Sequence, residues 1–467
     1  MKRILFILLI VFTSCFKDKG NYDYTDLSAP VVANFDSVYT VFTGDSLVIS
    51  PVVTLPGGKK DMTCTWKINI PEQARSDDYE GPELRILFGL GASTYSALFT
   101  VTDNSTGMKY FYKFSIAGKT AFTTGTIVLS DDAGGAKLSF IKPDGTVQPD
   151  LYQAINKEPL GTGAMQLVPV RNQFYMNVIF AYWIVCSGGV NPAIRINSDN
   201  LEKEKYIREN FYEAPASIVP GYFQNIINGT TTAIMNDQLF IGTSETAPFA
   251  TYYGYYGVPV SGNYRLAPDL VFTFTQAGSY YLGFDKVKRN LVRFNSSTYF
   301  GTDYTQEDSV FNPKDLRMDL IEMEKISEDD VYAFCRDSTG KAVELKFSLN
   351  FMNGNTRFKT LYQRPFPGDS LLTAGTRWQS SPVGVFYFSA GDKIYRYNPL
   401  NKEIRQLNTD FGGKAVTMIK LWNDGNVLLA GVQGSLYWLD VSTGKYGEVM
   451  RKVDGIPGNV KDVVIRE

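Results

Sequence analysis

Short stretches of alternating hydrophobic and polar residues follow one another between residues 31 and 116. A period of two turns one side of each stretch toward a core, which predicts β-strands. Residues 103–107 combine Asp, Asn, Ser and Gly between the last two stretches and predict a hairpin turn. Trp66 lies in a strand-like stretch and is expected in the core. The predicted strands cover residues 38–42, 47–53, 63–68, 84–88, 95–102 and 109–116. Six or seven strands in this length predict an Ig-like β-sandwich.

From Thr120 onward a longer period replaces this pattern. Residues 391–402 and 434–445 share a strand followed by a turn that ends in Lys, and the two copies begin 43 residues apart. That spacing is typical of β-propeller blades. Weaker copies at residues 137–140, 238–241, 290–295 and 343–347 are compatible with six or seven blades. A large two-layer β-sandwich is the alternative architecture, although it does not explain the spacing.

A propeller must close its ring, because closure removes the exposed edge strands. Residues 126–130 form an apolar strand that is expected to pair with the last blade near residues 460–466. Residues 198–211 are the best helix candidate, expected as an insertion between blades. We therefore predict an all-β chain with a sandwich at residues 30–118 and a propeller-like domain at residues 119–467.

The first residues read as an export signal. Lys2 and Arg3 precede nine apolar residues, 4–12, a run too short to span a membrane. Thr13, Ser14 and Cys15 then resemble the lipobox of bacterial lipoproteins, in which the cysteine receives a lipid and becomes the first mature residue. We predict a signal peptide at residues 1–14 and a lipidated tether at residues 15–29. An ordinary signal peptide is the alternative, but it would leave Cys15 as an exposed thiol.

Composition excludes several classes of function. Hydrophobic residues make up 44% and charged residues 20%, as in a globular protein, and the net charge of −2 without a basic run gives no footprint for nucleic-acid binding. The chain contains no histidine, which excludes Ser-His-Asp and Cys-His catalysis and removes the commonest zinc ligand. No motif indicates a metal or cofactor. A carboxylate-pair glycosidase remains open because Asp and Glu are plentiful.

Two aromatic features are candidate binding residues. Tyr252, Tyr253, Tyr255 and Tyr256 are four tyrosines within five residues, bracketed by glycines and Pro259. Exposed tyrosine can stack on a sugar or contact a protein partner. The competing interpretation is that these rings pack on their own fold. Trp378, in a polar setting, could line a pocket, with packing as its alternative role.

The first 120 residues resemble the PKD-like lipoproteins of Bacteroidetes. The resemblance rests on Cys15 to Tyr24 at the mature start and on residues 101–107 in the predicted hairpin. Lys17 and Asp18 also resemble the export signal that sends such lipoproteins to the outer face of the outer membrane. The resemblance implies an accessory lipoprotein of a SusC/SusD-type pair, a TonB-dependent importer with its lid, which takes up glycan or oligopeptide.

These observations lead to one expected function and two alternatives. We expect a lipid-anchored surface protein, not an enzyme, that serves as a binding component of a SusC/SusD-like uptake complex. One alternative is a carboxylate-dependent glycoside hydrolase or lyase on the propeller. The other is a purely structural subunit that docks on the transporter through the tyrosine-rich loop.

Overall fold

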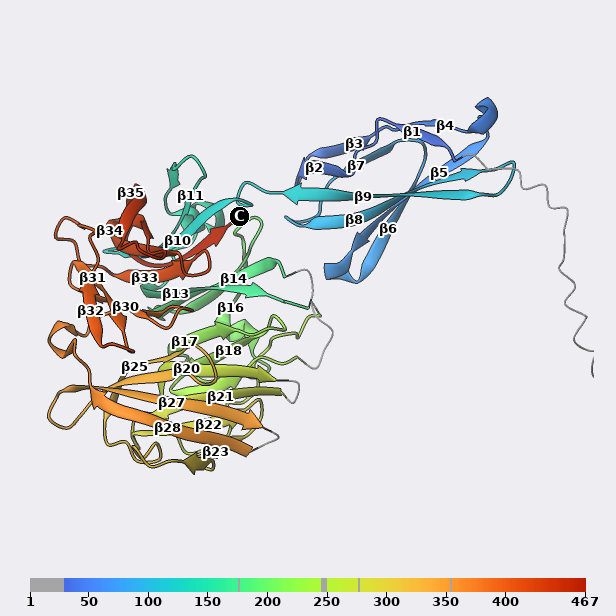
Figure 1. Ribbon diagram of the computed structural model, residues 1–467. Coiled ribbons are helices and arrows are strands. Elements are labelled where there is room, and N and C mark those ends of the chain that lie inside the picture. The colour runs from blue at the N-terminus through green and yellow to red at the C-terminus, as the bar shows by residue number, and fades with distance from the viewer. Residues whose placement is uncertain (1–28, 175–176, 245–249, 276–277, 353–354) are drawn as a thin grey trace, which may run out of the picture.

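The computed structural model describes residues 29–174, 177–244, 250–275, 278–352 and 355–467. Cys15, the predicted signal peptide and nearly all of the predicted tether lie outside these residues. The described chain is almost entirely β-structure and forms a sandwich followed by a propeller (Figure 1). The predicted fold class is therefore confirmed.

The N-terminal domain is a β-sandwich around one hydrophobic core. Its main sheet has the strand order β2-β9-β8-β5-β6, and two strand pairs, β1-β4 and β3-β7, form the other layer. Trp66 is buried in the core and stacks on Phe99 with ring centroids 4.1 Å apart. The strands are β1 (Val31–Ala33), β2 (Val38–Phe42), β3 (Ser46–Ile49), β4 (Val52–Thr54), β5 (Met62–Ile70), β6 (Arg75–Glu80), β7 (Leu84–Leu87), β8 (Thr94–Asp103) and β9 (Lys109–Lys119). The polar strand β6 has no apolar alternation, so its sequence did not predict it.

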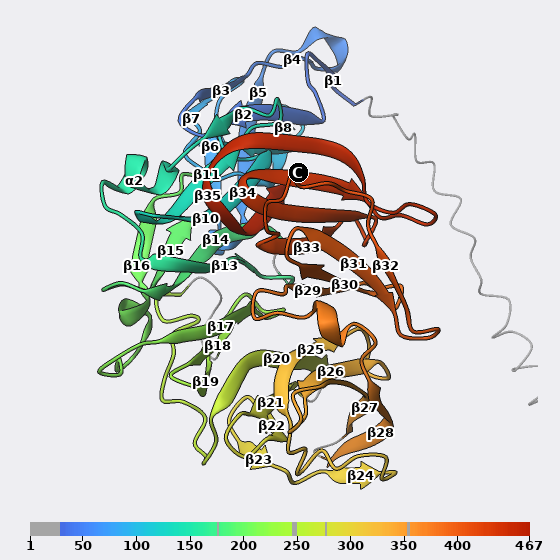
Figure 2. The same ribbon diagram turned by 90° about the vertical axis from the view of Figure 1, so that its left-hand side faces the viewer.

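Seven blades follow, and Figure 2 shows their sheets succeeding one another around a centre. Blade 1 contains β10 (Gly125–Asp132), β11 (Gly135–Ile141) and β12 (Val147–Gln148). Blade 2 contains β13 (Thr162–Arg171), β14 (Ile179–Gly188), β15 (Ala193–Asn197) and β16 (Lys203–Tyr206). Blade 3 contains β17 (Pro220–Asn225), β18 (Thr231–Met235) and β19 (Gln238–Ile241). Blade 4 contains β20 (Leu266–Thr275), β21 (Gly278–Asp285), β22 (Asn290–Asn295) and β23 (Tyr299–Gly301).

The remaining blades complete the ring. Blade 5 contains β25 (Asp319–Lys325), β26 (Val331–Arg336), β27 (Ala342–Met352) and β28 (Asn355–Pro365), with β24 (Thr305–Glu307) added in parallel. Blade 6 contains β29 (Trp378–Ser380), β30 (Phe386–Ala390), β31 (Lys393–Asn398) and β32 (Glu403–Gln406). Blade 7 contains β33 (Met418–Trp422), β34 (Val427–Asp440) and the first part of β35 (Glu448–Arg466).

The packing between blades holds the ring together. The first strands of neighbouring sheets contact one another in the order β13, β17, β20, β25, β29, β33, and β35 contacts both β33 and β13. Among the described residues, seven hydrophobic clusters each join two consecutive blades, and one of them joins blade 7 to blade 1. A blade buries its two faces only against its neighbours, as stacked repeats require.

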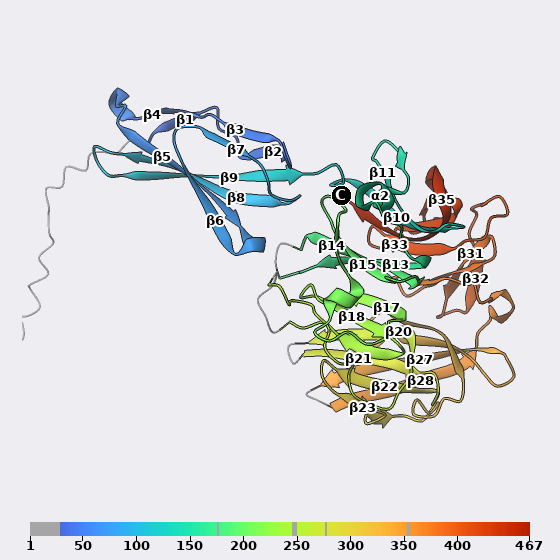
Figure 3. The same cartoon turned by 180° about the vertical axis from the view of Figure 1, so that it is seen from behind.

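The predicted closure is confirmed. The second part of β35 pairs antiparallel with β10, with Thr126 opposite Ile465 and Val128 opposite Val463. The end of the chain therefore supplies the innermost strand of blade 1, and Figure 3 shows the C-terminus beside β10.

The predicted helix at residues 198–211 is wrong. Asn197 accepts hydrogen bonds from the backbone N–H groups of Asp199 and Asn200, which makes a turn, and Leu201 has a positive φ of 60°. A side-chain-closed turn and a left-handed residue both prevent helix propagation. Strand β16 and the short 3-10 helix η3 (Ile207–Asn210) follow instead. The described α-helix is α2 (Leu151–Asn156), and η1 (Pro56–Gly58), η2 (Pro71–Gln73) and η4 (Asp369–Leu371) are further 3-10 turns.

Candidate functional site

Trp378 lies in the core between blades 5 and 6 and lines no described cavity. Its ring stacks on Phe334 at 4.4 Å and on Phe388 at 5.0 Å between centroids. With 8% of its surface exposed, the side chain offers little area for a ligand. This environment supports a packing role for Trp378, the alternative to a role in ligand binding.

The four tyrosines of the loop after blade 3 have different surroundings. Tyr256 is fully buried, hydrogen-bonds the hydroxyl of Thr231 at 2.6 Å and packs against Phe211 and Phe240. Tyr253 donates a hydrogen bond to the carbonyl oxygen of Asn228 at 2.6 Å and lines a cavity. Tyr256 is therefore a core residue, whereas Tyr253 lines a cavity that the sequence did not predict.

Tyr252 and Tyr255 form a surface cluster with Tyr212. The ring centroids lie 5.3 to 5.9 Å apart, and Tyr252 is 53% exposed. The Lys205 ammonium lies over the Tyr255 ring, 4.5 Å from its centroid, a cation–π contact. These two tyrosines are available to a partner, while Lys205 connects the cluster to the cavity on its other side.

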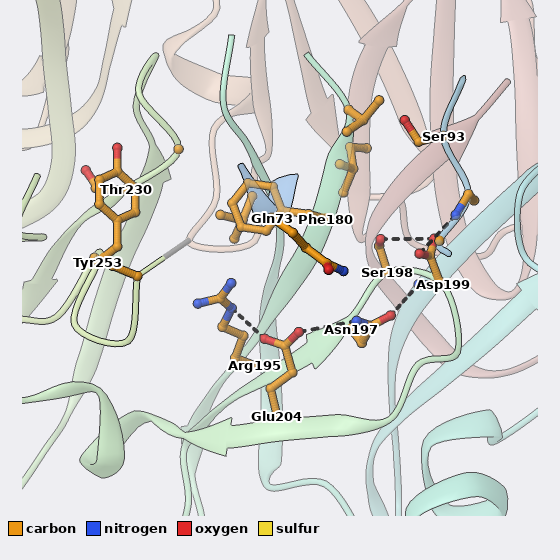
Figure 4. Close-up of a pocket in the computed structure, with 18 of the residues that line it drawn as sticks. Gln73, Ser93, Phe180, Arg195, Asn197, Ser198, Asp199, Glu204, Thr230 and Tyr253 are labelled. Carbon is orange, nitrogen blue, oxygen red and sulfur yellow. Dashed lines mark hydrogen bonds and ion pairs between the residues drawn. The ribbon is translucent and has the colours of Figure 1, made fainter. Parts of the chain in front are cut away.

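A cavity of about 450 Å³ lies where the N-terminal domain meets blades 2 and 3 (Figure 4). We call it the interdomain cavity. The sandwich contributes Gln73 and residues 89–93, and the propeller contributes Trp183 and Phe180 from β14. Its size falls within the range of about 300–1,000 Å³ that is typical of small-ligand sites. An apolar base beneath polar side chains suits a ligand with both kinds of surface.

A chain of polar contacts crosses one wall of the interdomain cavity. The Arg195 guanidinium pairs with Glu204 at 2.9 Å, and the Asn197 side-chain amide donates to Glu204 at 3.4 Å. The Asn197 side-chain oxygen then accepts from the backbone N–H of Asp199 at 2.8 Å. Figure 4 shows these side chains side by side along β15 and β16. The wall is therefore ordered before any ligand arrives, which lowers the entropic cost of binding.

Asp199 also ties the two domains together. Its carboxylate accepts a hydrogen bond from the backbone N–H of Ala92 at 3.0 Å and lies 3.8 Å from the Arg466 guanidinium. A Cβ at Gly91 would come within 2.1 Å of a carboxylate oxygen of Asp199, so only glycine permits this approach. The contact holds the loop of residues 89–93 over the cavity.

A second polar group lies on the inner strands of the propeller. Asp269 on β20 and Glu322 on β25 share a side-chain hydrogen bond, and the hydroxyl of Ser380 donates to Glu324 at 2.9 Å. We call Asp269, Glu322 and Glu324 the axis cluster. Burial raises the pKa of Asp269 to about 6 and that of Glu324 to about 7. Burial and the two neighbouring carboxylates raise the pKa of Glu322 well above its usual range.

The carboxyl groups of Asp269 and Glu322 interact directly, whereas a glycoside hydrolase, the alternative function considered above, holds its catalytic pair about 5–9.5 Å apart. Comparable side-chain contacts join other inner strands: Gln166 bonds the backbone of Phe223, and Asp462 accepts from the N–H of Leu167 at 2.8 Å. The axis groups therefore connect neighbouring blades.

Sequence reasoning missed most of the interdomain cavity. Its residues come from the sandwich, blade 2 and blade 3, and none of those segments carries a motif. The single available signal is Tyr253, which lies in the tyrosine-rich loop. Among the described residues, no group of three or more His, Cys, Asp or Glu side chains is placed to hold a metal ion, and no helix is long and apolar enough to cross a membrane.

The N-terminal part of the chain matches a known family model. Residues 15–163 match the model of the PKD-like family, which covers the sandwich and the strands β10 to β12. No curated protein matches the sequence.

Solved structures with similar folds share little sequence with the chain. A quinonprotein alcohol dehydrogenase-like protein from Bacteroides thetaiotaomicron is 13% identical with a TM-score of 0.47, over 94% of this chain and 99% of that one. A puromycin-hydrolyzing peptidase from Mycobacterium tuberculosis is 11% identical with a TM-score of 0.43, over 76% of this chain and 51% of that one.

Proposed function

We propose that this protein is a surface lipoprotein of the outer membrane, anchored through Cys15, that acts as a non-catalytic binding component of a SusC/SusD-like uptake complex for glycan or oligopeptide. The interdomain cavity is its ligand site. The observation that carries the proposal is the cavity itself, about 450 Å³ in volume and lined by both domains, with a pre-ordered polar wall over an aromatic base.

The proposed tether would keep the ligand site close to the transporter. A lipid on Cys15 and the short polar segment after it would hold the binding body beside a transporter in the same membrane. Confinement raises the effective concentration of captured ligand at the importer, so modest affinity is sufficient. Exposed Tyr252 and its half-buried neighbour Tyr255 are the proposed contact with the transporter or its lid.

The association is tested by purifying the tagged full-length protein from native outer membranes in mild detergent and identifying the proteins that accompany it by mass spectrometry. We expect a SusC/SusD-like pair in fixed proportion. A Cys15→Ser variant, which cannot be lipidated, should lose the pair. Recovery of the wild-type protein alone would contradict the uptake role, and the glycoside hydrolase or lyase alternative would then be tested by enzymatic screens.

The location of the ligand site is tested separately with the substrate of that pair. Gln73 is exposed and reaches into the cavity in Figure 4, so Gln73→Trp should fill the space without disturbing a core. We expect this variant to lose binding in calorimetry. Ser46→Trp, at an exposed position of the same domain that does not line the cavity, is the matched control and should bind normally. Normal binding by Gln73→Trp would place the site elsewhere.

A further inference from the structure

The charges that line the interdomain cavity are balanced with one exception. Glu204 is paired with Arg195, and Asp199 lies near Arg466 and accepts the N–H of Ala92. Lys205, the remaining charged residue of the lining, forms no ion pair with any described residue. Counting Arg466, which is not among the lining residues, three cations stand against two carboxylates, and Lys205 is the cation without an ion pair to a described residue.

The described groups in contact with the Lys205 ammonium are neutral. Its ammonium lies 3.4 Å from the side-chain oxygen of Asn210 and over the ring of Tyr255, two neutral contacts. Burial, with a smaller contribution from Arg195, lowers its pKa to about 8, while Glu204 and Glu209 act in the opposite direction. The ammonium is thus partly desolvated, and an anion entering the cavity would restore the interaction that water supplied.

We infer that the interdomain cavity selects a small acidic saccharide of the uronate type, whose carboxylate pairs with Lys205. This inference rests on the proposed function, because it names the ligand class of the same site. The accessible neutral polar groups of the lining, among them Gln73, Asn197 and Thr251, can hydrogen-bond sugar hydroxyls. The half-buried ring of Phe180 can contact the apolar face of a sugar ring.

A peptide is a poorer match for this charge pattern. A zwitterionic di- or tripeptide brings an ammonium as well as a carboxylate, and an ammonium needs a negative partner when it leaves water. Both carboxylates that line the cavity already have arginine partners. A ligand with a single negative charge and many hydroxyls leaves no charge unmatched.

The test uses the purified full-length protein in mild detergent and isothermal titration calorimetry. The probes are galacturonate and glucuronate, each with one carboxylate, the methyl ester of galacturonate, which keeps the shape but not the charge, and dialanine. The variants are Lys205→Met and Lys205→Arg. Lys60→Met removes the same charge from an exposed position outside the cavity and is the matched control.

We expect a uronate to bind at least about tenfold more tightly than the methyl ester, a difference of about 1.4 kcal/mol, because only the uronate can form a charge-assisted hydrogen bond with Lys205. Lys205→Met should remove this preference and leave affinity for the ester unchanged, whereas Lys205→Arg and Lys60→Met should retain it. The inference is overturned if acid and ester bind equally, if Lys205→Met binds the acid normally, if dialanine binds as tightly, or if neither uronate binds at about 10 mM. Each of these results is independent of whether a SusC/SusD-like pair co-purifies.

Discussion

The carboxylates of the interdomain cavity have arginine neighbours, whereas those of the axis cluster lie beside one another. In the cavity, each acid has an arginine nearby: Glu204 has Arg195, and Asp199 has Arg466. In the axis cluster, three acids gather, Asp269 and Glu322 share a hydrogen bond, and burial raises the pKa of all three. Balanced charges leave the cavity polar, whereas the carboxyl groups of the axis cluster lose their protons only at raised pH and join neighbouring blades.

A further carboxylate, outside both sites, has a more complete set of partners than the carboxylates of either. Glu344, fully buried on β27, accepts hydrogen bonds from Arg364 at 2.9 Å, Tyr362 at 2.6 Å and Tyr397 at 2.5 Å. We expect Glu344→Ala to lower the free energy of unfolding by about 3–5 kcal/mol, because it leaves the Arg364 guanidinium without a negative partner. Chemical denaturation measures the change. A loss below about 1 kcal/mol would show that this pair is not structurally important.

The axis cluster predicts a stability that falls as pH rises. A carboxyl group whose pKa is raised by folding binds more protons in the folded state, so its contribution is full below its unfolded pKa and is lost as pH rises through the folded value. For Asp269 and Glu324 the loss should run from about pH 4 to about pH 7.

The double variant Asp269→Asn, Glu324→Gln should therefore be more stable than wild type at pH 8, by several kcal/mol, and should differ less at pH 4. Denaturation series at the two pH values measure the difference between the variants, which cancels the titration of other groups. An equal effect at both pH values would mean that folding does not raise the pKa of these two carboxyl groups.

In the interdomain cavity, removing a carboxylate should destabilise the protein, in contrast to the axis cluster. We expect Asp199→Ala to destabilise the protein by about 1–2 kcal/mol, because Arg466 loses its acidic neighbour and the N–H of Ala92 loses its acceptor. The same variant should loosen the sandwich from the propeller, which small-angle X-ray scattering would record as a larger radius of gyration. If its dimensions match those of wild type, other contacts hold the domains.

The smallest change in stability is expected for Tyr252, which belongs to neither the interdomain cavity nor the axis cluster. Tyr252 is 53% exposed and contacts other rings only at the surface, so Tyr252→Ala should change the free energy of unfolding by less than about 0.5 kcal/mol. Thermal melting provides the measurement. A large loss would mean that the tyrosine cluster supports the fold, as Tyr256 does, and would remove it as the proposed partner contact.

The candidate sites were much harder to predict than the fold, for a structural reason. Asp269 and Glu322 lie at irregularities in the pairing of β20 with β21 and of β25 with β26. A bulge turns a side chain away from the direction that strict alternation predicts. The cavity joins Gln73, Asn197 and Tyr253, which are far apart in the chain and carry no shared motif.

By itself, the sequence determined the all-β class, the sandwich around Trp66, the blade period of 43 residues and the pairing of residues 126–130 with the end of the chain. Those features repeat locally, with period two within strands and a fixed period between blades, so they can be read from one sequence. Only the tertiary structure decided that residues 198–211 form a turn, a strand and a 3-10 helix, that Trp378 and Tyr256 are core, and that Lys205 faces a cavity without a counter-charge. These depend on which distant segments pack together, because burial and charge balance are properties of neighbours in space.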